Sequence, residues 1–316
     1  MSEVFSQAVS SVLTLFCMGF VGYALARSGL ADSHVKNFLP IMVVRITLPL
    51  FLFSTTVRGY TRQDLADLTS WVGLGTLTVF LTFAVSLLAA RLIRPQGRRR
   101  GIFCASFAAS NTMYIGVPVN LALFGQQALN PAMAYFLANG IFFWTVGNYL
   151  MSLDGQKGRV PLVSLETVKR LLPPPMIGFL LGIAAVMAGI KVPDFLLNAS
   201  ASIGAMNTPL AVIYIGLGFY GLSLKSLKPW PEIAAVLSGR FIICPAITLA
   251  VCLLSHSPVL MTQVFTIQAS LPVLAAASIM AGYYQSDPDY AAVLVSLSTA
   301  LALVTIPVYR VLAAYI

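Results

Sequence analysis

The sequence predicts an all-α integral membrane protein with ten transmembrane helices, and three observations support this. Hydrophobic residues make up 58% of the chain and charged residues only 9%, whereas soluble domains average roughly 25% charged residues. Apolar runs of about twenty residues, the length that crosses a hydrocarbon core, recur along the chain. Because backbone groups in lipid must bond to one another, and the ten-residue alternation of a barrel is missing, these runs should be helices.

The position of each apolar run predicts one span. The ten spans are expected near residues 4–27, 34–57, 69–93, 99–125, 130–153, 173–190, 197–222, 230–255, 259–284 and 287–313. The first span follows Met1-Ser2-Glu3-Val4 with no basic segment before it, and it is too long for a signal peptide. A cleaved signal is therefore not expected.

Basic residues indicate which side of the membrane each loop faces. Of the 19 Lys and Arg residues, thirteen lie in loops after odd-numbered spans, four lie on the opposite side and two lie within spans. Because short cytoplasmic loops collect basic residues, both termini are expected outside, in a bacterial inner membrane. The net charge of +9 then reports orientation, and a nucleic-acid partner is not expected because no soluble domain is predicted.

The ten spans divide into two halves of five. An odd number of helices per repeat makes the second copy run upside down, as in many transporters. We expect two inverted five-helix repeats, residues 1–153 and 173–316, joined by a polar cytoplasmic linker at 154–172. The second and fourth spans of both halves contain prolines at matching places, namely Pro49, Pro118, Pro209 and Pro272.

The fourth span carries polar and helix-breaking residues inside an apolar run. It reads Ser110-Asn111-Thr112-Met113-Tyr114-Ile115-Gly116-Val117-Pro118-Val119-Asn120. Proline lacks an N–H and clashes with the preceding turn, glycine adds backbone freedom, and asparagine can bond to carbonyls freed by a break. The helix is therefore predicted to unwind here.

The ninth span repeats this pattern in Gln268-Ala269-Ser270-Leu271-Pro272. Its proline suits the first turn of a new half-helix. Two broken helices would then cross at the middle of the membrane, where half-helix N-termini favour an anion. The alternative is that both prolines are ordinary kinks, which membrane helices tolerate. Their matched positions favour the crossing.

The motif Asn111-Thr112-x-x-x-Gly116-x-Pro118 resembles the fourth-span signature of the auxin efflux carriers, which include plant auxin exporters and bacterial malonate-type transporters. Pro272, the segment Tyr284-Gln285-Ser286-Asp287-Pro288-Asp289 and the short linker extend the resemblance over the whole chain. It implies a fold of the bile acid/arsenite/riboflavin transporter superfamily, with helices four and nine broken and crossed. It further implies a carboxylate substrate at the crossing and elevator-type alternating access.

The resemblance also implies a set of substrate-binding residues. The fourth span would contribute Asn111, Gly116 and Pro118, with Thr112 and Tyr114 in the same motif. The ninth span would contribute Pro272, with Gln268 or Ser270 as its polar position.

Two arginines, Arg45 and Arg240, lie near the centres of predicted spans. A charge there costs roughly 2.5–3.5 kcal/mol on insertion scales and usually faces a cavity or a partner. All ten Asp and Glu residues lie in loops or at span ends, so a substrate carboxylate is one candidate counter-ion. The alternative is that each guanidinium caps carbonyls released at the proline breaks, or extends to the membrane surface.

Other patterns exclude several classes of site. The four cysteines and two histidines are scattered, so neither a metal site nor a cofactor is expected. The run Gly216-Leu217-Gly218-Phe219-Tyr220-Gly221 has dinucleotide-binding spacing but lies inside a span, and it is interpreted as close helix packing, as is Gly178-x-x-x-Gly182. With no HExxH motif or paired aspartates, an enzyme is not expected.

The sequence thus predicts a secondary transporter of small organic anions, such as malonate or auxin-like acids. Protein-borne proton coupling is disfavoured because no acid is predicted within the membrane, so uptake would need sodium at unwound carbonyls or a protonated substrate. Two alternatives stay open: a sodium- or proton-coupled symporter of another solute on the same fold, and a channel or sensor. The lipid bilayer surrounds the chain, and analogy with other elevators suggests a homodimer.

Overall fold

The computed structural model describes residues 17–155, 174–220 and 230–316. Within these ranges every regular element is a helix, which confirms the all-α prediction. Three helical segments are long and apolar enough to cross a membrane, Ser70–Ile93, Trp230–Leu254 and Pro288–Ala313. They coincide with the predicted spans 69–93, 230–255 and 287–313. The inverted repeat stays a prediction, and nearly all of the expected linker, residues 156–172, lies outside the described residues.

The first half of the chain begins with a helical segment at residues 17–27. The elements that follow are α2 (Ser33–Met42), the π-helical turn η1 (Val43–Thr47), α3 (Leu48–Gly59), α4 (Arg62–Ile93), α5 (Arg100–Ala108), the π-helical turn η2 (Thr112–Gly116), α6 (Val117–Phe124), the short 3₁₀ helix η3 (Gln126–Ala128), α7 (Leu129–Phe142), the π-helical turn η4 (Phe143–Gly147) and α8 (Asn148–Asp154). The second and fifth predicted spans thus contain a π-helical turn within a continuous run of helix, whereas the fourth span is broken between Ala108 and Thr112.

The second half begins, within the described residues, at α10. Its elements are α10 (Pro174–Ala188), α11 (Asp194–Gly204), α12 (Asn207–Tyr220), α13 (Trp230–Ser238), the π-helical turn η6 (Gly239–Ile243), α14 (Cys244–Leu254), α15 (Val259–Ala269), α16 (Ala276–Tyr284) and α17 (Pro288–Ala313).

The prediction of one continuous helix at 197–222 is wrong. The chain forms α11 and α12 instead, separated at Ala205 and Met206. Pro209 consequently lies in the first turn of α12 rather than in mid-helix. The first turn is where proline fits without losing a hydrogen bond, so a helix start at Asn207 accommodates it.

Prolines also explain three of the π-helical turns. Pro49, Pro118 and Pro245 each occupy the second position of the α-helix that directly follows η1, η2 and η6 respectively. The proline ring clashes with the carbonyl four residues earlier and offers no N–H in return. A wider π-helical turn at that point absorbs the misfit.

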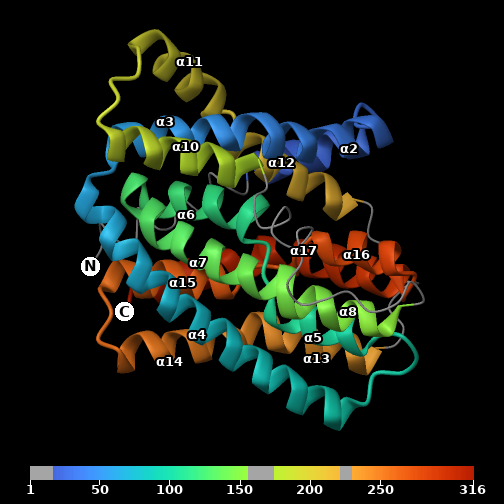
Figure 1. Cartoon of the computed structure of the whole chain (residues 1–316). Helices are drawn as coiled ribbons and strands as arrows, with labels where there is room; N and C mark the ends of the chain where they lie inside the picture. The colour runs from blue at the N-terminus through green and yellow to red at the C-terminus, as the bar shows by residue number, and fades with distance from the viewer. Residues whose placement is uncertain (1–16, 156–173, 221–229) are drawn as a thin grey trace.

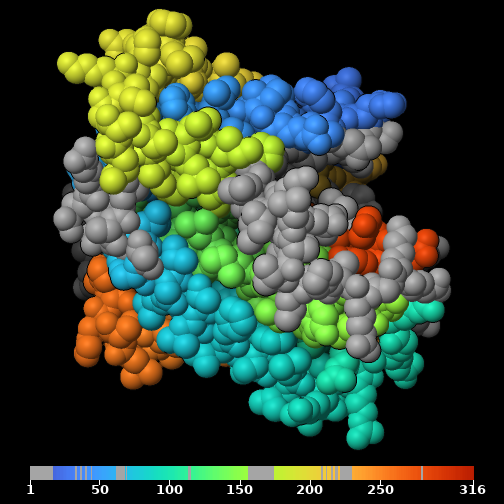
Figure 2. Space-filling model, viewed as in Figure 1, coloured from blue at the N-terminus to red at the C-terminus, as the bar shows by residue number. Residues whose placement is uncertain are grey.

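The helices form two layers, and each layer combines both halves of the chain. In the first layer α3 packs against α10 and α11, and α12 contacts α2. In the second layer α4 packs on α7, α5 on α8, α14 on α15 and α16 on α17. Figure 1 shows the first layer above the second. The space-filling view shows the same division, with blue and yellow surface above cyan, green and orange (Figure 2).

Glycines permit the closest helix contacts in the first layer. A Cβ atom on Gly182 would lie 2.7 Å from the Cβ of Thr56, and one on Gly178 would collide with the Pro49 carbonyl. A Cβ atom on Gly216 would collide with the Gly19 carbonyl. These contacts confirm that Gly178, Gly182 and Gly216 serve close helix packing.

Candidate functional site

The second layer contains two broken helices whose breaks meet. Helix α5 ends at Ala108 and η2 begins at Thr112, while α15 ends at Ala269 and α16 begins at Ala276. Ser110 forms an isolated antiparallel bridge with Val273. The Asn111 N–H donates to the carbonyl of Pro272 over 2.9 Å. The two segments expected to unwind therefore cross and bond to each other directly.

The prolines lie near these breaks, but Pro272 does not stand where the sequence suggested. Pro272 was expected in the first turn of a new half-helix, yet it precedes α16 by four residues and lies in the non-helical segment. There its carbonyl accepts the Asn111 hydrogen bond. Pro118 follows the first break by seven positions, within α6. The fourth span is fully unwound only around Ser110, and it continues through the π-helical turn η2.

A side chain that the sequence did not single out, Asn139 of α7, satisfies the first break. Its Oδ1 accepts from the Ser110 N–H over 2.9 Å, and its Nδ2 donates to the Ser110 carbonyl over 2.9 Å. The same Nδ2 donates to Thr112 Oγ1 over 3.3 Å. The only sequence signal for this role was an asparagine within an apolar span.

Ser298 of α17 plays the corresponding part at the second break. Its Oγ accepts from the Val273 N–H over 3.0 Å. Buried backbone groups almost always have a partner. Each unwound segment obtains one from a side chain on a neighbouring helix.

Gly116 and Gln268 bring the two broken helices into close contact. A Cβ atom on Gly116 would lie 2.6 Å from Leu271 Cδ1 and closer still to Gln268 Oε1. The position of the Gln268 amide is fixed by a hydrogen bond, because its Nε2 donates to the Ala132 carbonyl over 3.1 Å. Asn120 Nδ2 donates to the Gly116 carbonyl over 2.8 Å. Glycine is thus required at position 116 for this approach.

The predicted polar site residues are buried at the crossing. Asn111, Thr112, Gln268 and Ser270 are each at most 2% exposed. Ser270 Oγ donates to the Ile267 carbonyl over 2.9 Å, so it closes the last turn of α15. Tyr114 belongs to η2, but its side chain lies outside the described part of the structure.

Three buried oxygens around the crossing have no hydrogen-bond partner within the described residues. They are Ser110 Oγ, Gln268 Oε1 and Asn120 Oδ1. Buried polar atoms without a partner are rare, and they commonly mark a place where water or a ligand binds. All three belong to residues of the two broken helices: Ser110 lies in the first break, Asn120 in α6 and Gln268 in α15.

Arg240 lies within this crossing and is completely buried. Its Nη1 donates to the Phe107 carbonyl over 2.8 Å and its Nη2 to the Ala269 carbonyl over 2.5 Å. Its Nε donates to the Leu271 carbonyl over 3.2 Å. Of the two roles considered for Arg240, capping of carbonyls at the breaks is the one that describes these hydrogen bonds.

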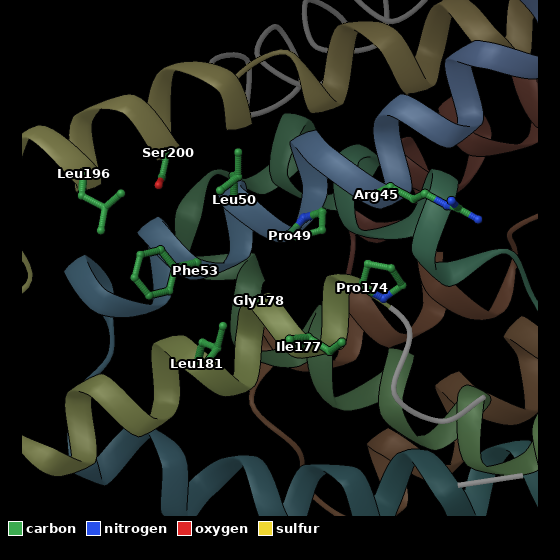
Figure 3. A pocket seen from close by; sticks show the side chains of 10 residues that line it. All are labelled: Arg45, Pro49, Leu50, Phe53, Pro174, Ile177, Gly178, Leu181, Leu196 and Ser200. Atoms are coloured by element: carbon green, nitrogen blue, oxygen red, sulfur yellow. The ribbon is translucent and has the colours of Figure 1, made fainter. Parts of the chain in front are cut away.

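Arg45 occupies a different environment. It lies in η1, is exposed, and borders a cavity of about 390 Å³ in the first layer (Figure 3). The other lining residues are almost all apolar: Pro49, Leu50, Phe53, Pro174, Ile177, Gly178, Leu181, Leu196 and Ser200. Within the described ranges, Arg45 makes no hydrogen bond to the residues of the crossing, although η1 itself contacts η2.

A charged cluster joins helix ends away from the crossing. Arg99, directly before α5, lies 2.6 Å from Asp287 through its Nε and 3.8 Å from Glu232 through its Nη1. Its guanidinium also stacks over the Tyr290 ring, 5.1 Å from the centroid. Glu232 was expected at a span end, but its burial at 5% exposure was not foreseen. The cluster ties together the starts of α5, α13 and α17.

Asp154, the last residue of α8, caps the start of α5. Its Oδ2 accepts from the Gly101 N–H and, over 3.4 Å, from the Ile102 N–H. Burial raises the pKa of the Asp154 carboxyl above its usual value, and this outweighs the two N–H groups that lower it. No cluster of three or more His, Cys, Asp or Glu residues that could hold a metal ion occurs in the described ranges.

Comparison with known proteins agrees with this architecture. The model of a family described as "Membrane transport protein" matches residues 7–310. An "Uncharacterized transporter" of Methanothermobacter thermautotrophicus is 24% identical, over 98% of this chain and 99% of that protein. The "Uncharacterized transporter MJ1031" of Methanocaldococcus jannaschii is 25% identical, over 94% of this chain and 96% of that protein. The chain belongs to this membrane transport protein family, that of the auxin efflux carriers, and is an integral membrane transporter.

Proposed function

We propose that this transporter carries small organic anions, and that the substrate binds where the two broken helices cross. The observation that carries the proposal is the direct contact between the breaks, through the Asn111 N–H and the Pro272 carbonyl at 2.9 Å. Unwound backbone within a membrane is tolerated only where protein surrounds it or where it lines a water-filled cavity. In transporters such discontinuous helices form the substrate site.

The polarity of the crossing favours an anion. The half-helices that start at Thr112 and Ala276 direct their first N–H groups toward the breaks, and a helix N-terminus carries a partial positive charge. The buried Arg240 offsets the partial negative charge of the α5 and α15 C-termini, whose carbonyls it holds. No acidic residue within the described ranges pairs with Arg240. With those C-terminal carbonyls held by Arg240, a carboxylate at the crossing would meet the N–H groups of the two half-helix N-termini.

Asn111 and Thr112 are the side chains that we assign to the substrate, because both are buried and both belong to the break itself. Gly116 and Gln268 would shape the opposite wall. Arg45 would supply a second positive charge to a substrate that enters from the first layer. The substrates that this arrangement suits are small carboxylates, such as malonate or an auxin-like acid.

Transport would proceed by an elevator motion of the second layer against the first, with the crossing carried along. The same proposal includes ten helices in two inverted repeats, a bacterial inner membrane, both termini outside and a homodimer. An inside-negative potential expels a monoanion with about 2.3 kcal/mol per 100 mV, so uncoupled flux would run outward.

The test is uptake of radiolabelled malonate and of indole-acetate into proteoliposomes under imposed potential and ion gradients. Wild type is compared with Asn111→Ala and with the matched control Asn198→Ala, whose amide is exposed and bonded to Arg58. We expect saturable flux of one acid. Asn111→Ala should reduce it about 10- to 100-fold, since a hydrogen bond to a charged group contributes about 1.5–3 kcal/mol.

Three outcomes would count against parts of the proposal. If neither acid moves under any gradient, the organic-anion assignment is wrong. If Asn111→Ala transports like Asn198→Ala, the site is wrong. If flux does not saturate and shows no counterflow, the protein is a channel rather than a carrier.

A further inference from the structure

Arg240 links the two broken helices at the crossing through their backbone carbonyls. Phe107 lies in the last turn of α5, Ala269 ends α15, and Leu271 belongs to the unwound segment. All three carbonyls accept a hydrogen bond from the Arg240 guanidinium, at 2.5–3.2 Å. One positively charged group therefore holds carbonyls from both halves of the chain.

The helix ends around Arg240 favour a positive charge at this position. The C-terminal end of a helix carries a partial negative charge, and here the ends of α5 and α15 meet. Their last carbonyls have lost their helical partners because both helices stop. Unpaired carbonyls buried in an apolar interior would be costly. A cation surrounded by carbonyl oxygens resolves both problems.

Such a set of converging carbonyl oxygens is also what a hard metal cation binds. In transporters, unwound carbonyls and half-helix C-termini commonly coordinate the coupling Na⁺. Here the side chain of Arg240, rather than a metal ion, lies among the carbonyl oxygens. The guanidinium stays protonated in a protein, and its planar fork of five N–H groups is suited to several acceptors at once. Counting a weak contact to Cys244 Sγ at 3.7 Å, four of these five N–H groups face protein acceptors.

We propose that Arg240 is a built-in cation that takes the place of a coupling metal ion at the crossing, so that anion transport needs neither Na⁺ nor K⁺. The inference rests on the proposed transport function for its flux consequences. The part of the inference that concerns how the carbonyls are held does not depend on the proposed transport function. Arg240 is accordingly a positioning residue: it acts through the shape and potential of the crossing rather than by contact with the substrate.

The structural part is tested by thermal unfolding of the purified full-length protein. Arg240→Ala leaves the three carbonyls without a cation and should lower the unfolding temperature. Millimolar guanidinium should raise it again, whereas an equal concentration of choline, which has no N–H group, should not. The control is Arg91→Ala, which removes the same side chain from an exposed position on α4 and should show no guanidinium-specific effect.

The functional part is tested by flux in proteoliposomes. Wild-type transport should be equal in Na⁺, K⁺ and choline buffers at a fixed membrane potential. Arg240→Ala should reduce it about 10- to 100-fold, the range typical of residues that orient ligating groups. Guanidinium should restore flux to Arg240→Ala without affecting Arg91→Ala. Such chemical rescue would not be expected if Arg240 merely filled space.

Each remaining outcome also decides the question. Acceleration of wild type by a Na⁺ gradient would overturn the inference. So would a folded Arg240→Ala that ignores guanidinium. If Arg240→Ala cannot be purified folded even with guanidinium, Arg240→Lys is used instead. Arg240→Lys should transport more slowly than wild type and independently of Na⁺. Flux through Arg240→Lys that depends on Na⁺ would refute the inference. If wild type moves no acid, the transport proposal fails while the unfolding test still decides the role of Arg240.

Discussion

Gly116 offers the most direct test of how closely the two broken helices approach. In Gly116→Ala the added methyl carbon would lie 2.6 Å from Leu271 Cδ1 and closer still to Gln268 Oε1. The Gln268 side chain cannot simply swing aside, because its amide nitrogen is bonded to the Ala132 carbonyl. The helices must therefore move apart or Gln268 must break that bond.

The size of the effect follows from comparison with a second glycine. Gly140 in α7 has no atom within 4 Å of an added Cβ, so Gly140→Ala adds a methyl group without a clash. Both substitutions gain about 1 kcal/mol or less from the higher helix propensity of alanine. Only Gly116→Ala also suffers overpacking, which typically costs about 1–3 kcal/mol. The two variants should therefore differ by about 1–3 kcal/mol in free energy of unfolding.

The assay is reversible unfolding of both variants in mixed micelles, followed by flux in proteoliposomes. A third variant, Gly116→Ala combined with Gln268→Ala, removes the nearest atom and should recover part of the loss, since Leu271 remains. Equal stability of Gly116→Ala and Gly140→Ala would refute the close contact between η2 and α15. A double variant less stable than the sum of its parts would show that Gln268 is not the source of the clash.

Three further predictions concern groups that hold helix ends and breaks. Asn139→Leu should destabilise the protein by about 1–3 kcal/mol in unfolding experiments, because it leaves the buried N–H of Ser110 unpaired, whereas the Ser110 carbonyl keeps the Thr112 N–H as a donor. A loss below about 1 kcal/mol would contradict this role. Asp287→Ala should cost about 0.5–2 kcal/mol through loss of the α17 cap, and up to about 1 kcal/mol more through loss of the ion pair with Arg99. Asp289→Ala, at an exposed position of the same turn, should cost less, and thermal unfolding of the two variants distinguishes them. The pKa of Asp154 is raised in the folded state, so the protonated carboxyl stabilises the fold below the ordinary pKa of about 3.9, and this stabilisation is lost as the pH rises through the raised pKa. Asp154→Asn should therefore flatten the pH dependence of the unfolding temperature over that window. An unchanged pH profile would contradict a raised pKa for Asp154.

Apolar composition was sufficient to predict the long helices. The predicted spans 69–93, 230–255 and 287–313 correspond closely to Ser70–Ile93, Trp230–Leu254 and Pro288–Ala313. This succeeds because the length of an apolar run is a property of the chain alone. The same is true of the breaks in spans four and nine, since proline, glycine and clustered polar residues are local signals.

The partners of the broken segments could not be predicted in this way. Asn139 lies 29 residues from Ser110, and Ser298 lies 25 residues from Val273. Which side chain reaches which carbonyl depends on how the helices pack, and that packing has no local sequence signature. For the same reason the sequence left two roles open for Arg240, whose acceptors Phe107 and Ala269 belong to different halves of the chain.

The origin of these partners bears on how the crossing would move. Asn139 belongs to α7, Ser298 to α17 and Arg240 to η6, and all three elements lie in the second layer. The hydrogen bonds that these three side chains make to the two breaks, within the described residues, therefore do not span the boundary between the layers. A motion of the second layer past the first would leave every one of these bonds intact, whereas a motion that separated α5 from α15 would expose several buried carbonyls at once. The cost of unpaired buried groups thus favours movement of the crossing as one rigid unit, as the elevator motion that we propose would require.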